Sequence, residues 1–264
     1  MSRRPRYGAM TVREWLVFAA LAWLAAAASP GQTARTTTIA SATPAKDAAP
    51  AEPTGFPNTA EALRYSLNWP GGASLGEAHL RASKEADGWQ FDFSLDASIP
   101  GFALSDHYHS HSNAELCSLE LEKESTHGQR KTHERTVFDY QEGRATRTTL
   151  VEGGGHTDIS IGNCAHDGLD FVFFARRVLA QGHGVPPPQD VLFGASYAVR
   201  LAFAGVQDIT VAGKHRQADH IILYIKGPAS DSHLDIFFER NSARTPLIIK
   251  APLAVGTLSM ELER

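Results

Sequence analysis

Three histidines alternate in the segment HYHSH, at His107, His109 and His111. Side chains two residues apart in an extended strand lie on the same face, so these three imidazoles are predicted to project together. Neutral imidazoles in such an arrangement can bind zinc or copper. Leu104 and Tyr108 belong to the opposite face, which has the more core-like side chains, so the histidines are predicted to face solvent. Two interpretations remain: a metal site with these three ligands, or a solvated polar face.

Cys117 and Cys164 are the only cysteines in the sequence. In an oxidising compartment, an even number of cysteines favours a disulfide. Cys117 shares its strand face with Leu119 and Leu121 and is predicted to point inward, whereas Cys164 lies just before a predicted helix. The alternatives are a disulfide that ties the approach to this helix to the sheet, or two separate thiols.

Known catalytic motifs are absent from the sequence, which has no G-x-S-x-G, H-E-x-x-H, P-loop or G-x-G-x-x-G pattern. The glycines at 153–155 do not open a helix directly and are better explained as a loop. The acidic residues are scattered over polar strand faces, and no pair stands out for acid–base chemistry. The sequence therefore favours a non-enzymatic protein, and it indicates no catalytic residue and no cofactor.

One helix is predicted, over residues 170–182 (DFVFFARRVLAQG). Arg176 and Arg177 are predicted to lie away from its apolar face, and Asp167 and Asp170 are placed to cap its N-terminus. The apolar positions with i, i+3, i+4 and i+7 spacing are Phe171, Phe174, Ala175 and Val178. Such a helix either packs on one side of a sheet or plugs a lipid-sized cavity.

The rest of the folded chain is predicted to form strands. The clearest alternation runs over residues 89–98, where Trp89, Phe91 and Phe93 share one face with Leu95. Further strands are predicted at 63–69, 73–84, 104–111, 116–126, 130–140, 144–152, 197–203, 207–212, 218–226, 233–240, 246–251 and 255–263. So many short strands with Gly and Pro turns predict a mainly β fold, namely a large curved antiparallel sheet or incomplete β-barrel. The principal helix, 170–182, is expected against its concave side.

The first 30 residues have the pattern of a secretory signal peptide, with four arginines before the apolar run 15–28 and alanines suited to cleavage. The alternative is an uncleaved membrane anchor, although the run is short for a membrane span. Residues 31–57 are rich in Ala, Thr and Pro and are predicted to be a disordered linker. Residues 58–264 are predicted to form a single β-rich domain. We therefore expect a periplasmic or secreted protein whose mature form does not span a membrane.

Charge limits the partners that we expect. The chain has 25 Lys and Arg against 29 Asp and Glu, and removing the signal peptide leaves 21 against 28. An acidic domain of this kind does not favour nucleic acid, which is bound by clustered basic side chains. The expected partners are a lipid, a lipidated protein or another envelope protein.

A family resemblance is carried by the strand 63–69 with Gly76, by Phe138-Asp139, by the helix after Asp170, and by the paired strands up to Pro246. Together these resemble the exported-protein family of domain of unknown function 3108 (DUF3108) over residues 63–263. The resemblance implies a β-rich domain located in the bacterial envelope, without an established activity. More distantly, the layout is similar to periplasmic lipoprotein carriers, whose unclosed barrels hold acyl chains under a helical lid.

Three hypotheses follow for function. The first is a non-enzymatic binding domain for an apolar ligand, such as a lipid or acyl chain, held between the helix and the concave sheet. The second is a structural or protein-interaction module of the envelope, and the third is a metal-binding protein that uses the histidine strand. The predicted apolar lining of the first consists of Phe171, Phe174, Val178, Trp89, Phe91 and Phe93.

Overall fold

The computed structural model describes residues 56–99, 102–182, 184–228, 231–253 and 256–263. The predicted signal peptide, and the predicted linker as far as residue 55, lie outside the described residues. In the first half of the chain, the strands are β1 Glu61–Asn68, β2 Ser74–Lys84, β3 Gly88–Ile99, β4 Phe102–Asn113, β5 Ser118–His127, β6 Arg130–Asp139, β7 Arg144–Thr149 and β8 His156–Ser160. After them come β9 His166–Asp167, the helix α1 Gly168–Ala180, β10 Gln189–Leu192, β11 Ser196–Val211, β12 Lys214–Lys226, β13 Asp231–Glu239, β14 Pro246–Leu253 and β15 Gly256–Leu262.

All of these strands belong to one sheet, in the order β8-β7-β6-β5-β4-β3-β2-β1-β15-β14-β13-β12-β11-β10-β9. Neighbouring strands pair antiparallel except β9 and β10, which are parallel because α1 lies between them in the chain. The sheet is strongly curved and does not close, since β8 and β9 form its two ends. The predicted mainly β fold with an incomplete barrel is therefore confirmed.

The two-residue alternation decides which face of the sheet is buried. On β3, Trp89, Phe91, Phe93 and Leu95 are all buried, while the residues between them are partly or fully exposed. The extended backbone places these four side chains on one face, and the curved sheet covers that face. The same alternation on β4 places Leu104 and Tyr108 on the buried face and the three histidines on the outer face.

The strand β11 differs from prediction. The sequence suggested two strands, at 197–203 and 207–212, but one strand of 16 residues runs through both. Gly205 has a φ of 122° at the point where the register with β12 shifts between Phe203 and Gly205. A β-bulge at this point accommodates one extra residue in β11, so the pairing with β12 continues on both sides of it. The short strands β8, β9 and β10 were not predicted.

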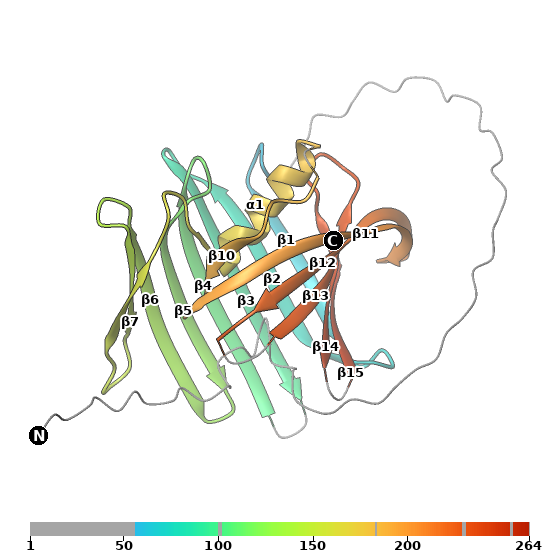
Figure 1. Ribbon diagram of the computed structural model, residues 1–264. Helices are drawn as coiled ribbons and strands as arrows, with labels where there is room; N and C mark the ends of the chain where they lie inside the picture. The colour runs from blue at the N-terminus through green and yellow to red at the C-terminus, as the bar shows by residue number, and fades with distance from the viewer. Residues whose placement is uncertain (1–55, 100–101, 183, 229–230, 254–255, 264) are drawn as a thin grey trace, which may run out of the picture.

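The helix α1 lies inside the curved sheet, between the part formed by β3 and β4 and the part formed by β11–β13 (Figure 1). Phe173 packs into a core cluster with Phe91 of β3, where the two rings stack at 4.0 Å between centroids. Phe171 and Leu179 belong to a second cluster with side chains of β11–β13. The helix thus has apolar side chains on two sides, which explains why its apolar residues exceed a single stripe.

The burial of Arg176 corrects the sequence analysis, which placed this residue away from the apolar face. Its side chain is fully buried and lies over the rings of Phe56 and Phe173. Phe56, which the sequence analysis placed in the linker, is also fully buried and contacts both Trp89 and Phe173. Phe56 therefore covers part of this side of α1, at Phe173 and Arg176.

Candidate functional site

An apolar cleft lies between the first half of α1 and the strands that follow it. From the helix it is lined by Gly168, Phe171 and Val172, and from the sheet side by Val191, Phe193, Tyr197, Val199, Leu223 and Ile225. The atoms that line the cleft are apolar, and its cavity is about 30 Å³. This volume is close to that of one water molecule in the liquid. The cleft therefore holds a methyl-sized group as it stands, and a longer chain requires lining side chains to move.

The six predicted lining residues are divided between the two sides of α1. Phe171 lines the cleft, whereas Trp89, Phe91 and Phe93 belong to the other core cluster, in which Phe91 stacks on Phe173. The separation follows from the helix itself, because side chains two residues apart point to nearly opposite sides.

The remaining two predicted lining residues are only partly buried. Phe174 packs against both core clusters and stacks on the imidazole of His166 at 4.2 Å. Val178 is also partly buried. Neither side chain lines the apolar cleft as it is formed in this structure.

A buried polar cluster fixes the N-terminus of the helix. Asp167 is the N-cap, and its Oδ1 accepts the backbone N–H groups of Leu169 and Asp170 at 2.8 and 2.9 Å. Its Oδ2 accepts the hydroxyl of Ser110 at 2.6 Å, and its own backbone N–H donates to Ser118 Oγ at 2.7 Å. The predicted capping role of Asp167 is confirmed, and the two serines connect the cap to β4 and β5.

The second carboxylate of this cluster belongs to Asp170. His166 Nδ1 lies 2.7 Å from its Oδ2, and the hydroxyl of Ser118 donates to the same oxygen at 3.1 Å. Burial raises the pKa of Asp167 to about 6, and the neighbouring charge of Asp170 acts in the same direction. Burial also raises the pKa of Asp170, although His166 opposes this effect. The Ser118 hydroxyl donates to a carboxylate and not to the imidazole, so this cluster does not have the arrangement of a Ser-His-Asp triad. Its hydrogen bonds attach the start of α1 to the sheet, and we call the cluster the helix anchor.

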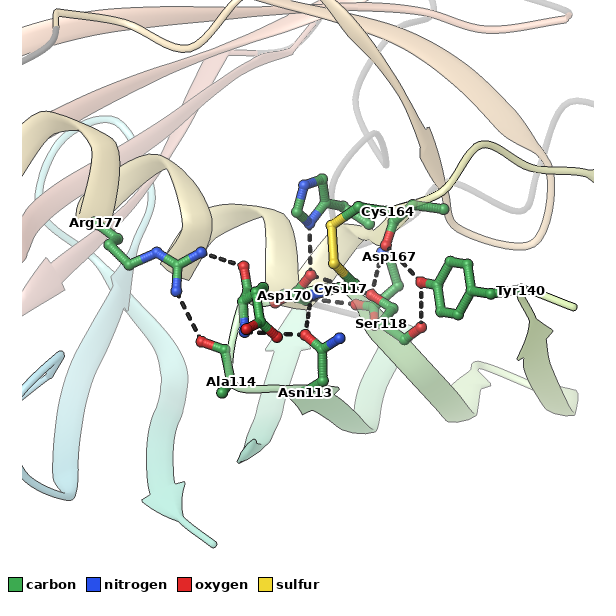
Figure 2. Close-up of a disulfide and its surroundings, with 12 residues drawn as sticks. Asn113, Ala114, Cys117, Ser118, Tyr140, Cys164, Asp167, Asp170 and Arg177 are labelled. Atoms are coloured by element: carbon green, nitrogen blue, oxygen red, sulfur yellow. Dashed lines mark hydrogen bonds and ion pairs between the residues drawn. A yellow bond between two sulfur atoms is a disulfide. The ribbon is translucent and has the colours of Figure 1, made fainter. Parts of the chain in front are cut away.

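The disulfide lies directly beside this anchor (Figure 2). Cys117, immediately before β5, is bonded to Cys164, three residues before the helix cap. Tyr140 donates its hydroxyl to the carbonyl of Ser118 at 2.6 Å, and burial raises the pKa of this tyrosine to about 12, so it remains a donor at neutral pH. Arg177 donates to the carbonyls of Ala114, at 3.0 Å, and of Glu115. The disulfide and the bonds of Ser118 to Asp167 and Asp170 therefore tie the start of α1 to β5 and to the residue before it, and Arg177 ties the last turn of α1 to the loop before β5.

Further along the helix, Arg176 forms a buried ion pair with Glu61 of β1. Its Nη1 and Nη2 lie 2.7 and 3.0 Å from the two carboxylate oxygens, and its Nε donates to the carbonyl of Ala243 at 3.1 Å. A buried guanidinium needs such partners, because an unpaired charge in the interior is very costly. No local sequence pattern indicates this pair, since Glu61 and Ala243 lie far from Arg176 in the chain.

On the outer face of β4, the three alternating histidines do not form one cluster. His109 and His111 approach each other, with their Nε2 atoms 2.8 Å apart. His107 instead has its Nε2 3.4 Å from Ser105 Oγ, on the same strand. Two of the three predicted ligands therefore converge, and their convergence is decided by side-chain rotation that strand periodicity does not specify.

A second group on the same outer face can also present metal ligands. Glu122 and Glu124 of β5 and His133 of β6 each offer one ligand atom, and these atoms lie within 4.8 Å of one another. His133 Nε2 is 2.6 Å from Glu122 Oε1 and 3.5 Å from Glu124 Oε1. The sequence analysis did not identify this group, because it depends on the register that places Glu124 opposite His133.

Comparisons with known proteins agree with this architecture. The family described as "Protein of unknown function (DUF3108)" matches residues 64–263. Among solved structures, the chain is similar to a beta-barrel-like protein of domain of unknown function DUF1849 from Brucella abortus. That similarity has a TM-score of 0.55 and 8% sequence identity, and it covers 76% of this chain and 94% of the other. Such low identity shows the fold alone.

No curated protein matches the sequence. Within the described part of the chain, no helix is long and apolar enough to cross a membrane. The match over residues 64–263 covers most of the chain, and the chain therefore belongs to the DUF3108 family.

Proposed function

We propose that this chain is an exported cell-envelope protein whose barrel-like domain binds an apolar group in the cleft between α1 and strands β10–β12. The observation that carries the proposal is the apolar lining of this cleft, which is formed jointly by the helix and by the concave side of an unclosed sheet. Export is supported by the signal-peptide pattern of residues 1–30.

The size of the cleft indicates how the ligand is held. A cavity of about 30 Å³ accepts the end of an apolar chain, and typical small-molecule sites of about 300–1,000 Å³ are much larger. The helix is held in place by the disulfide, the Asp167 cap and the Arg176–Glu61 pair. Adjustment is therefore expected in side chains such as Phe171 and Phe193, and not in a displacement of the whole helix.

A fluorescent apolar probe tests this proposal. The full-length protein, purified with its disulfide intact, is titrated with 1-N-phenylnaphthylamine, and bound probe is then displaced with palmitate. We expect an increase in fluorescence that palmitate reverses. Val199→Phe fills the cleft from β11 and is expected to abolish the increase. Arg200→Phe adds the same ring at the neighbouring, exposed position and is expected to leave the increase unchanged.

Two results would contradict the proposal. No fluorescence increase with the wild-type protein would show that the cleft takes up no apolar group. An unchanged increase in a folded Val199→Phe variant would place the binding elsewhere. A thermal melt of each variant establishes that it is folded, because overfilling a packed site commonly costs about 1–3 kcal/mol.

A further inference from the structure

The pair formed by His109 and His111 brings two imidazole nitrogens to a distance at which they share either a proton or a cation. Both side chains project from the outer face of β4, and their rings meet edge to face with centroids 4.6 Å apart. The two Nε2 atoms are separated by 2.8 Å. At this distance, at least one nitrogen must carry a proton, or a cation must lie between the two.

A carboxylate lies near the other nitrogen of each ring and favours a proton there. Asp92 Oδ1 is 2.6 Å from His109 Nδ1, and Glu85 Oε2 is 3.6 Å from His111 Nδ1. A carboxylate accepts hydrogen bonds, so Asp92 favours a proton on His109 Nδ1. Glu85 is beyond hydrogen-bond distance of His111 Nδ1 and favours a proton there only through its charge. Neutral rings with protonated Nδ1 direct both Nε2 lone pairs at each other, and this is unfavourable unless a cation is shared.

We propose that His109 and His111 bind a divalent transition-metal ion, of the zinc or copper class, through their two Nε2 atoms. Tetrahedral zinc with N ligands at about 2.0–2.1 Å requires the two nitrogens to be about 3.3 Å apart, so the rings need to separate by only about 0.5 Å. Their side chains are 36% and 35% exposed, which leaves room for water to complete the coordination.

The surroundings of the pair fit this assignment. Asp92 is oriented by Gln90, whose Nε2 donates to Oδ2 at 3.2 Å, while Oδ1 faces His109. A carboxylate that accepts the second N–H of a metal-binding histidine fixes the ring and raises its basicity. His109 also lines an open trough of about 690 Å³ on the outer face of the sheet, together with the carboxylates of Glu122 and Glu124. These negative charges attract cations to this face.

This inference is independent of the proposed function, because the pair lies on the outer face of β4 and the apolar cleft lies inside the sheet. Zinc binding is measured on the full-length protein without a polyhistidine tag, by isothermal titration calorimetry and by metal analysis after equilibrium dialysis with zinc chloride. We expect one zinc ion to bind to the wild type, and His109→Ala/His111→Ala to lose it. Asp92→Asn is expected to weaken the affinity about 10–100-fold, and His107→Ala and His133→Ala to leave it unchanged.

Three results would overturn the assignment. A wild-type protein that takes up no zinc shows that the two imidazoles share a proton only. Zinc binding that survives in His109→Ala/His111→Ala places the ion elsewhere. Zinc binding that is lost in His133→Ala but kept in the double variant places the ion at Glu122, Glu124 and His133. These side chains are partly or fully exposed, and thermal melts of the variants are expected to match the wild type.

Discussion

The ion pair between Arg176 and Glu61 gives a quantitative prediction about how α1 is held. The guanidinium is fully buried, and its nitrogens lie 2.7 and 3.0 Å from the two carboxylate oxygens of Glu61, whose side chain is 9% exposed. Arg176→Met keeps much of the side-chain volume but leaves this carboxylate unpaired and the carbonyl of Ala243 without its donor. Removing one member of a buried pair costs about 3–5 kcal/mol, so we expect the free energy of unfolding to fall by this amount.

A double-mutant cycle separates the cost of leaving one charge unpaired from the cost of losing the whole ion pair. In Arg176→Met/Glu61→Leu both charges are removed together, and the remaining expected cost is about 1–3 kcal/mol for the unsatisfied carbonyl of Ala243. The double variant is therefore expected to be more stable than Arg176→Met alone, although it carries one more substitution. Urea unfolding followed by circular dichroism measures the wild type, Arg176→Met, Glu61→Leu and the double variant. The reasoning is refuted if Arg176→Met costs less than about 1 kcal/mol, or if the double variant is less stable than the single one.

Three further predictions concern the helix and its anchor. Cys117→Ser/Cys164→Ser opens a loop closed over 47 residues and is expected to lower the free energy of unfolding by about 4 kcal/mol in urea; an unchanged midpoint would show that the bond does not restrain the chain. The raised pKa of Asp167, about 6 against 3.8, means that the folded state keeps a proton that the unfolded state has released, so stability is expected to fall as pH rises from about 4 to 6. Asp167→Asn keeps a capping oxygen but has no carboxyl group to titrate, so it should lack this pH-dependent loss of about 3 kcal/mol. Its free energy of unfolding should therefore rise relative to that of the wild type between pH 4 and pH 7. Parallel pH profiles of the two proteins would contradict the assignment. Phe171→Ala enlarges the cleft and is expected to cost about 3–5 kcal/mol while increasing uptake of the naphthylamine probe; reduced uptake by the folded variant would argue against the cleft as the binding site.

The periodic spacing of apolar residues in the sequence predicted most of the fold. Alternation over residues 89–98 predicted the buried face of β3, and the apolar run after Asp170 predicted α1, because both patterns follow directly from backbone geometry. The short strands β8 and β10 could not be predicted in this way. Each has only four or five residues, and it pairs because a neighbouring strand is already in place.

The features of the site that escaped prediction depend on contacts distant in sequence. Arg176 resembles an exposed helix residue until Glu61 and Phe56 are brought against it, and nothing local to the helix indicates either partner. The histidines were identified as candidate ligands from their spacing alone. Their grouping into the pair His109 and His111, without His107, depends on side-chain rotation and on the carboxylate of Asp92 across the strand pair.

Native mass spectrometry tests the proposed binding in the apolar cleft most directly. Wild-type protein and the Val199→Phe variant are purified from the cell-envelope fraction, and each is measured before and after denaturation. The account predicts a bound lipid-sized mass on the wild type that is lost on denaturation, and its absence from Val199→Phe. A wild-type protein without any bound mass, or an equal bound mass on the two proteins, would contradict it.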